Sequence, residues 1–316
     1  MTIFYILIFL ASCVLLTLTA RWLINSLVFV AKFLGLKEFV VAFFVMSFAS
    51  SAPNLFVGII SAINKIPELS LGDVTGGNLI DLTLVIALAV LISKNGLEAQ
   101  SRTAQSTAVF TVVAALLPML LMIDGILSQT DGLILLLAFA VYSFWLFSKK
   151  ERFSKVYDGV SHLRFSVFLK HAMIILIGTA LLFISSEGII KSAEFFAKAI
   201  NLPLGLIGVL IVGVGTSMPE TWFSLMSVRR EETWMVLGNL MGSVVNTATL
   251  VLGIVSLISP IKISNSAPYI SARIFLAVSA LFFLLAIRTG RKITKKEGIL
   301  FLIMYIAFLI SQIILR

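Results

Sequence analysis

The sequence predicts an all-α polytopic membrane protein, with ten transmembrane helices forming two inverted-topology repeats of five and broken helices at the centre. Three observations lead to this fold class: an extreme apolar composition, regularly spaced apolar segments, and an internal duplication. Of the 316 residues, 59% are hydrophobic and only 12% are charged, and the mean hydropathy is +1.10. Because soluble domains are about 25% charged, we expect this chain to lie in a lipid bilayer.

The apolar segments give the helix count, because a membrane-spanning helix needs about 20 apolar residues. Ten such segments lie at 2–31, 38–64, 70–93, 104–123, 130–148, 166–198, 203–228, 233–258, 269–287 and 297–315. The first enters its apolar run without a basic stretch and is too long for a signal peptide, so we expect a retained helix. The first and sixth segments are longer than a bilayer requires, which predicts steep tilts.

The duplication is visible in the polar motif Phe48–Asn54, which Val214–Glu220 repeats 166 positions later. The same offset relates Leu71-Gly72 to Leu237-Gly238, Gly76 to Gly242, and Thr83-Leu84-Val85 to Thr249-Leu250-Val251. Because each unit has an odd number of segments, the second unit must enter the membrane the opposite way up. We therefore expect a first repeat at 1–148, a hinge loop at 149–165 and a second repeat at 166–316.

The basic residues indicate the orientation of the chain. With the charged hinge placed in the cytoplasm, 18 of the 24 Lys and Arg residues fall on the cytoplasmic side and six fall outside. The positive-inside rule then puts both termini outside. The expected location is the plasma membrane of a prokaryotic cell.

The net charge of +9 does not indicate a nucleic-acid partner, because the basic residues occupy short segments between apolar runs, without an aromatic and basic face. The one cysteine, Cys13, lies within an apolar run and excludes a disulfide or a thiolate metal site within one chain. The partner indicated by composition is the lipid bilayer.

Each repeat carries a proline, Pro53 or Pro219, inside an apolar segment. A proline leaves the carbonyl one turn earlier without its amide partner, which lipid tolerates only beside protein or a hydrated cavity. A broken helix near mid-membrane, with hydroxyls and a carboxylate beside it, forms a cation site. The alternative is a plain proline kink, but the polar cluster recurs at the same register in both halves.

The second part of each repeat is a glycine-rich helix start. Gly72 and Gly76, with Gly238 and Gly242 in the second half, allow this helix to approach the broken one closely. Asp81 follows one turn later, deep in a membrane segment, where a carboxylate is expensive unless it faces a partner or an ion. Asp73 lies nearer the helix start, where the helix dipole favours an acid. Two roles therefore stay open for Asp73: a structural one, and one in the entry of ions.

These paired motifs resemble those of the cation/Ca2+ antiporter superfamily, which includes the sodium/calcium exchangers. The family pattern G-T-S-x-P-E followed by G-N-x-x-G-S is matched by Gly215–Glu220 and Gly238–Ser243. The resemblance implies that Thr216, Ser217, Glu220 and Ser243 bind ions, with the backbone carbonyls of Ala49 and Gly215 supplying further oxygens. The corresponding positions of the first repeat are Ser50, Ser51, Asn54 and Gly77. Asp81 and Thr247 occupy one further pair of repeated positions in the expected site.

The first repeat departs from the family pattern. Asn54 stands where the family has glutamate, Gly77 replaces the downstream serine, and Asp81 occupies a position that is often asparagine. In the second repeat Thr247 stands opposite Asp81. The expected site therefore keeps two acids, Glu220 and Asp81, in a diagonal arrangement.

Carboxylate, hydroxyl, amide and carbonyl oxygens are a hard ligand set that suits Ca2+ and also Na+. With the resemblance, this set indicates a secondary active antiporter that exchanges Ca2+ for Na+ by alternating access, needs no cofactor and is functional as a monomer. The alternatives are an exchanger driven by H+ or moving another cation (Na+, Li+ or K+), and an uncoupled cation-conducting relative. An intramembrane hydrolase is disfavoured because the chain has no HExxH or GxSxG motif.

Overall fold

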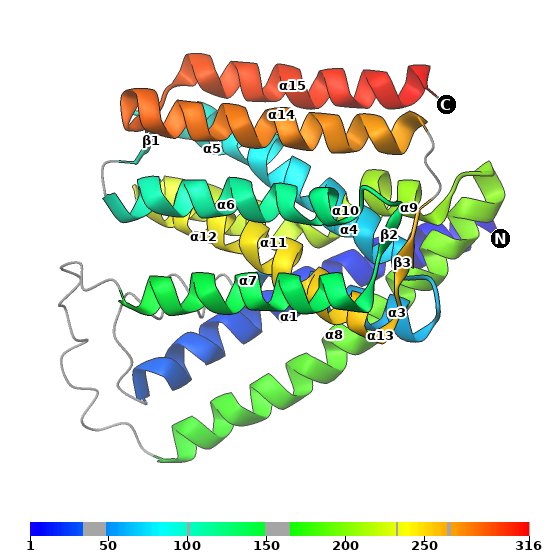
Figure 1. Cartoon of the computed structure of the whole chain (residues 1–316). Coiled ribbons are helices and arrows are strands. Elements are labelled where there is room, and N and C mark those ends of the chain that lie inside the picture. Colours follow the sequence, from blue (N-terminus) through cyan, green and yellow to red (C-terminus); the bar gives the residue numbers. More distant parts are fainter. Residues whose placement is uncertain (34–48, 100–101, 149–164, 232, 264–266, 316) are drawn as a thin grey trace.

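The computed structural model describes residues 1–33, 49–99, 102–148, 165–231, 233–263 and 267–315. Apart from four two-residue strands, all of its regular elements are helical (Figure 1). The first half contains α1 (Thr2–Phe33), α3 (Ala52–Ile63), α4 (Pro67–Ile80), η2 (Asp81–Val85), α5 (Ile86–Ile92), β1 (Leu97–Glu98), α6 (Arg102–Leu121), β2 (Ile126–Leu127) and α7 (Gln129–Ser148). The second contains α8 (Phe165–Ile200), α9 (Leu204–Ile207), η3 (Gly208–Val212), α10 (Gly213–Thr216), α11 (Met218–Arg229), α12 (Thr233–Val245), η4 (Asn246–Val251), α13 (Leu252–Ile258), β3 (Ile261–Lys262), α14 (Ala267–Gly290), β4 (Lys292–Ile293) and α15 (Lys295–Ile314).

Within the described residues, nine helical stretches are long and apolar enough to cross a membrane. They are Thr2–Leu27, Pro67–Ile92, Ala104–Leu121, Gln129–Ser148, Val167–Ile200, Leu204–Arg229, Met235–Ile258, Pro268–Gly290 and Lys295–Ile314. Each corresponds to a predicted segment. The tenth predicted segment, 38–64, is represented by the short apolar helix α3, because 38–48 lie outside the described residues. Of the predicted hinge, only Phe165 is described, as the first residue of α8.

The elements of the second half follow those of the first at a constant offset. Helices α11, α13 and α15 begin and end 166 positions after α3, α5 and α7, and α12 begins 166 positions after α4. The turns repeat as well. Lys65 and Glu231 have φ of 63° and 62°, and Gly125 and Arg291 also share a positive φ. The duplication seen in the sequence is thus a duplication of backbone conformation.

Helices α6 and α14, which occupy repeated positions, run in opposite directions. Strand β1, before α6, pairs antiparallel with β4, after α14, whereas β2, after α6, pairs with β3, before α14. These two small sheets lie at opposite ends of the bundle, and the two chain termini lie at the end that carries β2 and β3 (Figure 1). The start of α6 therefore lies near the end of α14, and the end of α6 lies near the start of α14.

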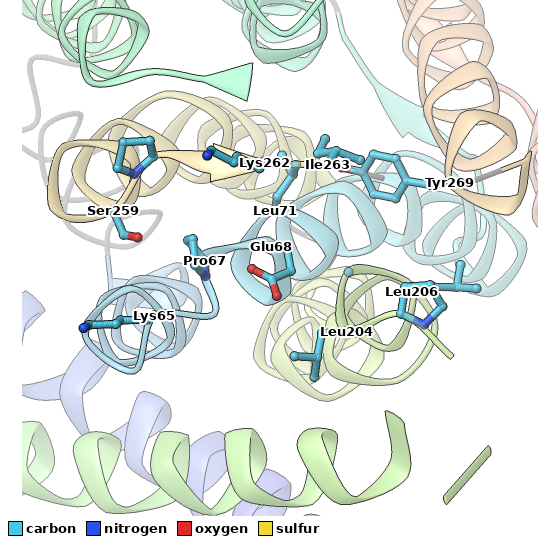
Figure 2. Close-up of a pocket in the computed structure, with 13 residues that line it drawn as sticks. Lys65, Pro67, Glu68, Leu71, Leu204, Leu206, Ser259, Lys262, Ile263 and Tyr269 are labelled. Atoms are coloured by element: carbon cyan, nitrogen blue, oxygen red, sulfur yellow. The ribbon is translucent and has the colours of Figure 1, made fainter. Parts of the chain in front are cut away.

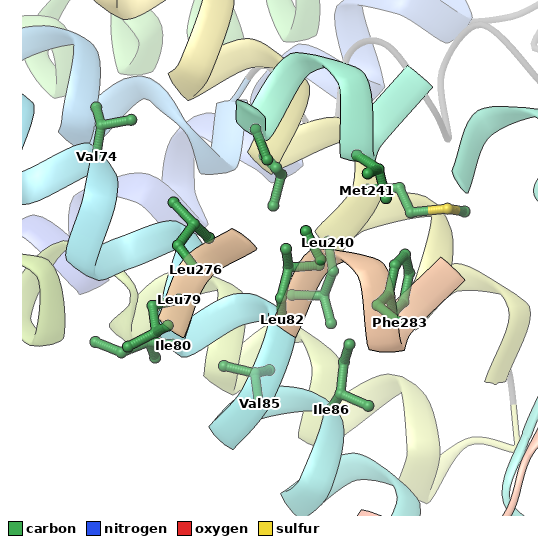
Figure 3. Close-up of a cluster of buried hydrophobic side chains, with 14 of the residues drawn as sticks. Val74, Leu79, Ile80, Leu82, Val85, Ile86, Leu240, Met241, Leu276 and Phe283 are labelled. Carbon is green, nitrogen blue, oxygen red and sulfur yellow. The ribbon is translucent and has the colours of Figure 1, made fainter. Parts of the chain in front are cut away.

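Burial separates a central group of helices from an outer pair. In the spans Pro67–Ile92 and Met235–Ile258, 78% of the most apolar window is buried, against 22% in α1 and 11% in α8. The long helices α1 and α8 lie side by side across one side of the bundle (Figure 1). The central spans pack through apolar side chains of α4, η2, α12 and α14, including Leu79, Leu82, Leu240 and Phe283 (Figure 3).

Glycines allow α4 to lie against the backbone of the other half. A Cβ atom on Gly72 would lie 1.9 Å from the carbonyl oxygen of Gly205, and one on Gly76 would lie 2.2 Å from that of Val209. The close approach predicted for these glycines is present. The partner is the stretch α9–η3, just before the helix break of the second half.

Candidate functional site

Two helix breaks lie at repeated positions. Ser51 and Ser217 have φ and ψ of −79° and −3°, and of −82° and 0°, whereas ψ in an α-helix is about −42°. Pro53 and Pro219 lie in the first turn of the helices that follow, α3 and α11, where the fixed φ of proline suits the start of a helix. The broken helices expected from the two motifs are therefore present.

The breaks leave backbone oxygens without their helical donors. Proline cannot donate to the carbonyl four residues earlier, which belongs to Ala49 in one half and to Gly215 in the other. Both residues are buried. A buried carbonyl needs another partner, and a cation is one that the resemblance implies.

Ser243 of α12 connects the two halves at the first part of the site. The hydroxyl of Ser51 donates to Ser243 Oγ at 3.3 Å, and Ser243 Oγ donates to Glu220 Oε1 at 3.2 Å. The second carboxylate oxygen of Glu220 is buried without a hydrogen-bond partner, as is Oδ1 of Asp81. The charges of these two acids interact, and Asp81 also lies beside Ser243. Glu220, Asp81, Ser51 and Ser243 therefore share one buried polar cluster.

Asp73 of α4 forms the second part of the site. Its side chain is fully buried, and Oδ1 accepts a hydrogen bond from the hydroxyl of Thr216 at 2.5 Å. Its other oxygen, Oδ2, accepts from Nδ2 of Asn54 at 3.2 Å. Asp73 thus connects Asn54, which follows the helix break at Ser51, to Thr216, which precedes the break at Ser217.

Two further polar contacts cross between the halves. Ser50 donates to Oδ1 of Asn239 at 3.1 Å, and Thr247 donates to Oδ1 of Asn78 at 2.7 Å. The first of these pairs is the counterpart of Thr216 with Asp73, because both of its members are shifted by 166 positions. All four side chains are buried.

Gly77 occupies the position that repeats as Ser243. A Cβ atom at Gly77 would lie 3.3 Å from Ser217 Oγ and 3.7 Å from Asn54 Nδ2. Position 77 therefore lies against Ser217 and Asn54, and it lacks the hydroxyl that Ser243 carries at the repeated position.

The sequence expectation was incomplete about the acids. It counted two carboxylates, whereas the structure buries a third, Asp73, in the same cluster. The part of the chain that the structure describes has no group of three or more His, Cys, Asp or Glu close enough to hold one metal ion. The three acids are therefore spread along the cluster rather than gathered around one point.

The amides Asn78 and Asn239 were also missed. The available signal was the offset itself, because Asp73 and Asn239 occupy repeated positions and both follow a glycine. A second missed feature is the pair of π-helical turns η2 and η4, which begin at Asp81 and Asn246. Such turns often occur at functional sites, but apolar periodicity does not reveal them.

Two surface hollows lie outside this cluster. One, of about 500 Å³, is lined by Lys65, Glu68, Lys262 and Tyr269 among others (Figure 2). The other, of about 540 Å³, includes Lys94, Glu231 and their neighbours. Neither is lined by a predicted site residue, and every site side chain is buried. Among the described residues, the polar cluster therefore opens into neither hollow.

Known proteins with solved structures or curated sequences resemble this chain over nearly its full length. The sodium/calcium exchanger MaX1 of Methanosarcina acetivorans is 23% identical, with 96% of this chain and 97% of that protein covered. A structure of the sodium-calcium exchanger NCX_Mj is 25% identical, covers 98% of this chain and 99% of its own, and has a TM-score of 0.71. The H+/Ca2+ exchanger CAX shares the fold, with a TM-score of 0.79 at 17% identity over 98% of this chain and 84% of its own.

The family model for the sodium/calcium exchanger protein matches twice, at residues 4–148 and 170–314. The two matches are separated by the offset that relates the helices, and together they account for most of the chain. The chain therefore belongs to the sodium/calcium exchanger protein family.

Proposed function

We propose that this integral membrane protein is a secondary active antiporter that exchanges Ca2+ for Na+ by alternating access. The observation that carries the proposal is the buried cluster of hydroxyl, amide and carboxylate oxygens, to which both halves of the chain contribute. Burying unpaired carboxylate oxygens is costly unless a cation or proton joins them. Glu220 Oε2 and Asp81 Oδ1 are such oxygens, because both are buried without a hydrogen-bond partner.

The chemistry of the cluster suits these ions. Ca2+ takes six to eight oxygen ligands, and Na+ is likewise a hard cation that accepts oxygen donors. Competition of the two ions for shared oxygens couples their opposite movements. The expected ligand set is Ala49, Ser50, Ser51, Asn54, Gly77, Asp81, Gly215, Thr216, Ser217, Glu220, Ser243 and Thr247.

For the moving part, we propose the pair α1 and α8, which are the two longest helices and are little buried. Helix α1 covers one helix break, because a Cβ atom on Gly215 would lie 2.6 Å from the Sγ atom of Cys13. Sliding of α1 would uncover this break. The rest of the bundle, packed around α4 and α12, would stay fixed.

For the orientation, we propose inverted repeats at 1–148 and 166–316, with the hinge in the cytoplasm and both termini outside. The opposite directions of α6 and α14 support the inversion, and the location of both termini at one end of the bundle agrees with it. The basic residues of the sequence assign the sides.

The function is tested by 45Ca2+ uptake into proteoliposomes under separately imposed Na+, K+ and pH gradients. We expect uptake only when Na+ is loaded inside and diluted outside. Uptake driven by a pH gradient alone would replace Na+ by H+, the ion named for CAX. Uptake that needs no opposing gradient would indicate an uncoupled conducting protein and contradict antiport.

The movement of α1 is tested at Cys13, the one cysteine of the chain and a buried one. We expect the rate of labelling by a thiol reagent to change when Na+ or Ca2+ is added, since the thiol is shielded beside Gly215. The Cys13→Ser variant controls for reaction at other groups. Equal rates under all ionic conditions would contradict the assignment of α1 as a moving helix.

A further inference from the structure

The acid and the amide are exchanged between the two repeats. Position 54 repeats as position 220, and position 73 repeats as position 239. The first repeat has Asn54 and Asp73, whereas the second has Glu220 and Asn239. Each half therefore carries one carboxylate and one amide at these two positions, but the carboxylate is on α4 in the first half and on α11 in the second.

The two positions that differ in this way, 54 and 73, are joined by one hydrogen bond in the first half. Nδ2 of Asn54 donates to Oδ2 of Asp73 at 3.2 Å, so the two side chains of the first half are in direct contact. Moving a carboxylate from one partner to the other displaces the negative charge by only the span of that contact. The charge in the first half is displaced rather than lost.

The surroundings of Asp73 fit a charged ligand. Thr216, which comes from the other half, donates to Oδ1, and Asn54 donates to Oδ2. An ionised carboxylate has about four acceptor sites, so both oxygens retain a lone pair for a cation. An amide that donates through Nδ2 also keeps its carbonyl oxygen as a neutral ligand.

One observation independent of Asp73 indicates that the cluster suits a positive charge. Glu220 Oε2 and Asp81 Oδ1 are both buried and lack hydrogen-bond partners. Gly77 packs closely against Ser217 and Asn54, since a Cβ atom there would lie 3.3 Å from Ser217 Oγ and 3.7 Å from Asn54 Nδ2. Ser217 and Asn54 therefore meet at Gly77, on the side of the cluster where Asn54 contacts Asp73.

We propose that Asp73 is a cation-binding carboxylate that replaces the missing acid at position 54, with Asn54 and Thr216 holding it in place. The ligand is a hard cation, Ca2+ or Na+. The proposal rests on the proposed antiport function. Because the acids do not gather around one point, Asp73 serves a cation position next to that of Glu220 rather than the same one.

The test is an exchange of the two side chains by mutation. The variants are Asp73→Asn, Asn54→Glu and the double variant Asn54→Glu/Asp73→Asn, with Glu98→Gln on the surface strand β1 as the control for loss of a distant carboxylate. Ca2+ affinity is measured by isothermal titration of the whole chain in detergent, and exchange is measured in proteoliposomes. Gel filtration and thermal melting without Ca2+ establish that each variant is folded.

We expect Asp73→Asn to lower Ca2+ affinity about tenfold or more, and the double variant to recover most of that loss. Asn54→Glu alone should bind Ca2+ but exchange slowly, because two carboxylates would then be in contact. A purely structural Asp73 would not be rescued by an acid at position 54. The proposal is overturned if folded Asp73→Asn binds Ca2+ like the wild type, or if the folded double variant binds no better than Asp73→Asn. Failure of the wild type itself to exchange Ca2+ would instead contradict the antiport function.

Discussion

The two halves of the molecule differ little in backbone and strongly in charge. Ser51 and Ser217 break their helices with nearly the same φ and ψ, and the turns at Lys65 and Glu231 share a positive φ. A helix break and a left-handed turn are local conformations that many side chains tolerate. The backbone of the repeat can therefore persist while the side chains at the site change.

The acids follow a different rule, because a bound cation responds to the summed charge of all the groups around it. The first half supplies Asp73 and Asp81, and the second supplies Glu220. Neither half needs a fixed pattern of acids as long as the summed charge around the cation is maintained. The predictions below test how far the two halves are interchangeable.

The largest effect is expected for Glu220→Gln, which removes the carboxylate of the second half while preserving its shape. Loss of one member of a buried charge pair costs about 3–5 kcal/mol, so we expect Ca2+ exchange to fall about 100-fold or more. The measurement is 45Ca2+ exchange in proteoliposomes, beside the Glu98→Gln control. Exchange at the wild-type rate in the Glu220→Gln protein would place the ion site elsewhere.

Most of the architecture could be predicted because it depends on properties that are local in sequence. Apolar run length set the spans, and the prolines at 53 and 219 set the helix breaks. Three of the four acids and hydroxyls in the chain Ser51, Ser243, Glu220 and Asp81 could be placed through the family motifs, and Asp81 through the cost of a carboxylate in lipid. The spans and helix breaks could be predicted because each had one strong physical constraint, whereas the ion-binding roles of these four side chains stay predictions.

Asp73 could not be assigned from sequence because two environments satisfy it. An acid near a helix start is stabilised by the helix dipole, and an acid beside a hydroxyl and an amide is stabilised by hydrogen bonds. Only the three-dimensional contacts with Thr216 and Asn54, one of them from the other half of the chain, distinguish the two. Contacts of this range carry no signal in a single sequence.

The next effect concerns the contact between the halves. In Gly76→Ala, the new Cβ atom would lie 2.2 Å from the carbonyl oxygen of Val209, so backbone must move. Overpacking of this kind costs about 1–3 kcal/mol, and we expect a lower melting temperature in detergent. Gly290→Ala is the matched control, because nothing lies within 4 Å of a Cβ atom at that position. Equal melting temperatures for the two variants would contradict the close packing of α4 on η3.

A smaller effect is expected at the repeated positions 77 and 243, of which only 243 has a hydroxyl. Ser243→Ala removes the hydroxyl that connects Ser51 to Glu220. A buried hydrogen bond contributes about 1 kcal/mol, so Ca2+ affinity should fall roughly fivefold. The affinity is measured by isothermal titration. The companion variant Gly77→Ser places a hydroxyl beside Ser217, and a loss of affinity as large as that of Ser243→Ala would show that position 77 must remain empty.

The smallest effect is expected at the surface, where the two hollows differ by an ion pair. Lys94 and Glu231 lie 2.6 Å apart with both side chains exposed, whereas the repeated positions hold Pro260 and Lys65. The hydrogen bond and charge of Lys94 lower the pKa of Glu231, and those of Glu231 raise the pKa of Lys94. The pair thus joins the segment after α5 to the turn after α11.

Glu231→Lys gives this turn the residue found at position 65, where lysine already adopts φ of 63°. Because the folded pKa of Glu231 is lowered, its contribution to stability is present above the ordinary value of 4.5 and disappears as the pH falls through the lowered pKa. The contribution of Lys94, whose pKa is raised, is present below the ordinary value of 10.5 and disappears only as the pH rises through the raised pKa. We therefore expect a small drop in melting temperature at neutral pH that vanishes in acid and shrinks at high salt, since exposed ion pairs are weak and screened. A large drop that persists at high salt would contradict an exposed pair and would indicate that this contact holds the end of the bundle closed.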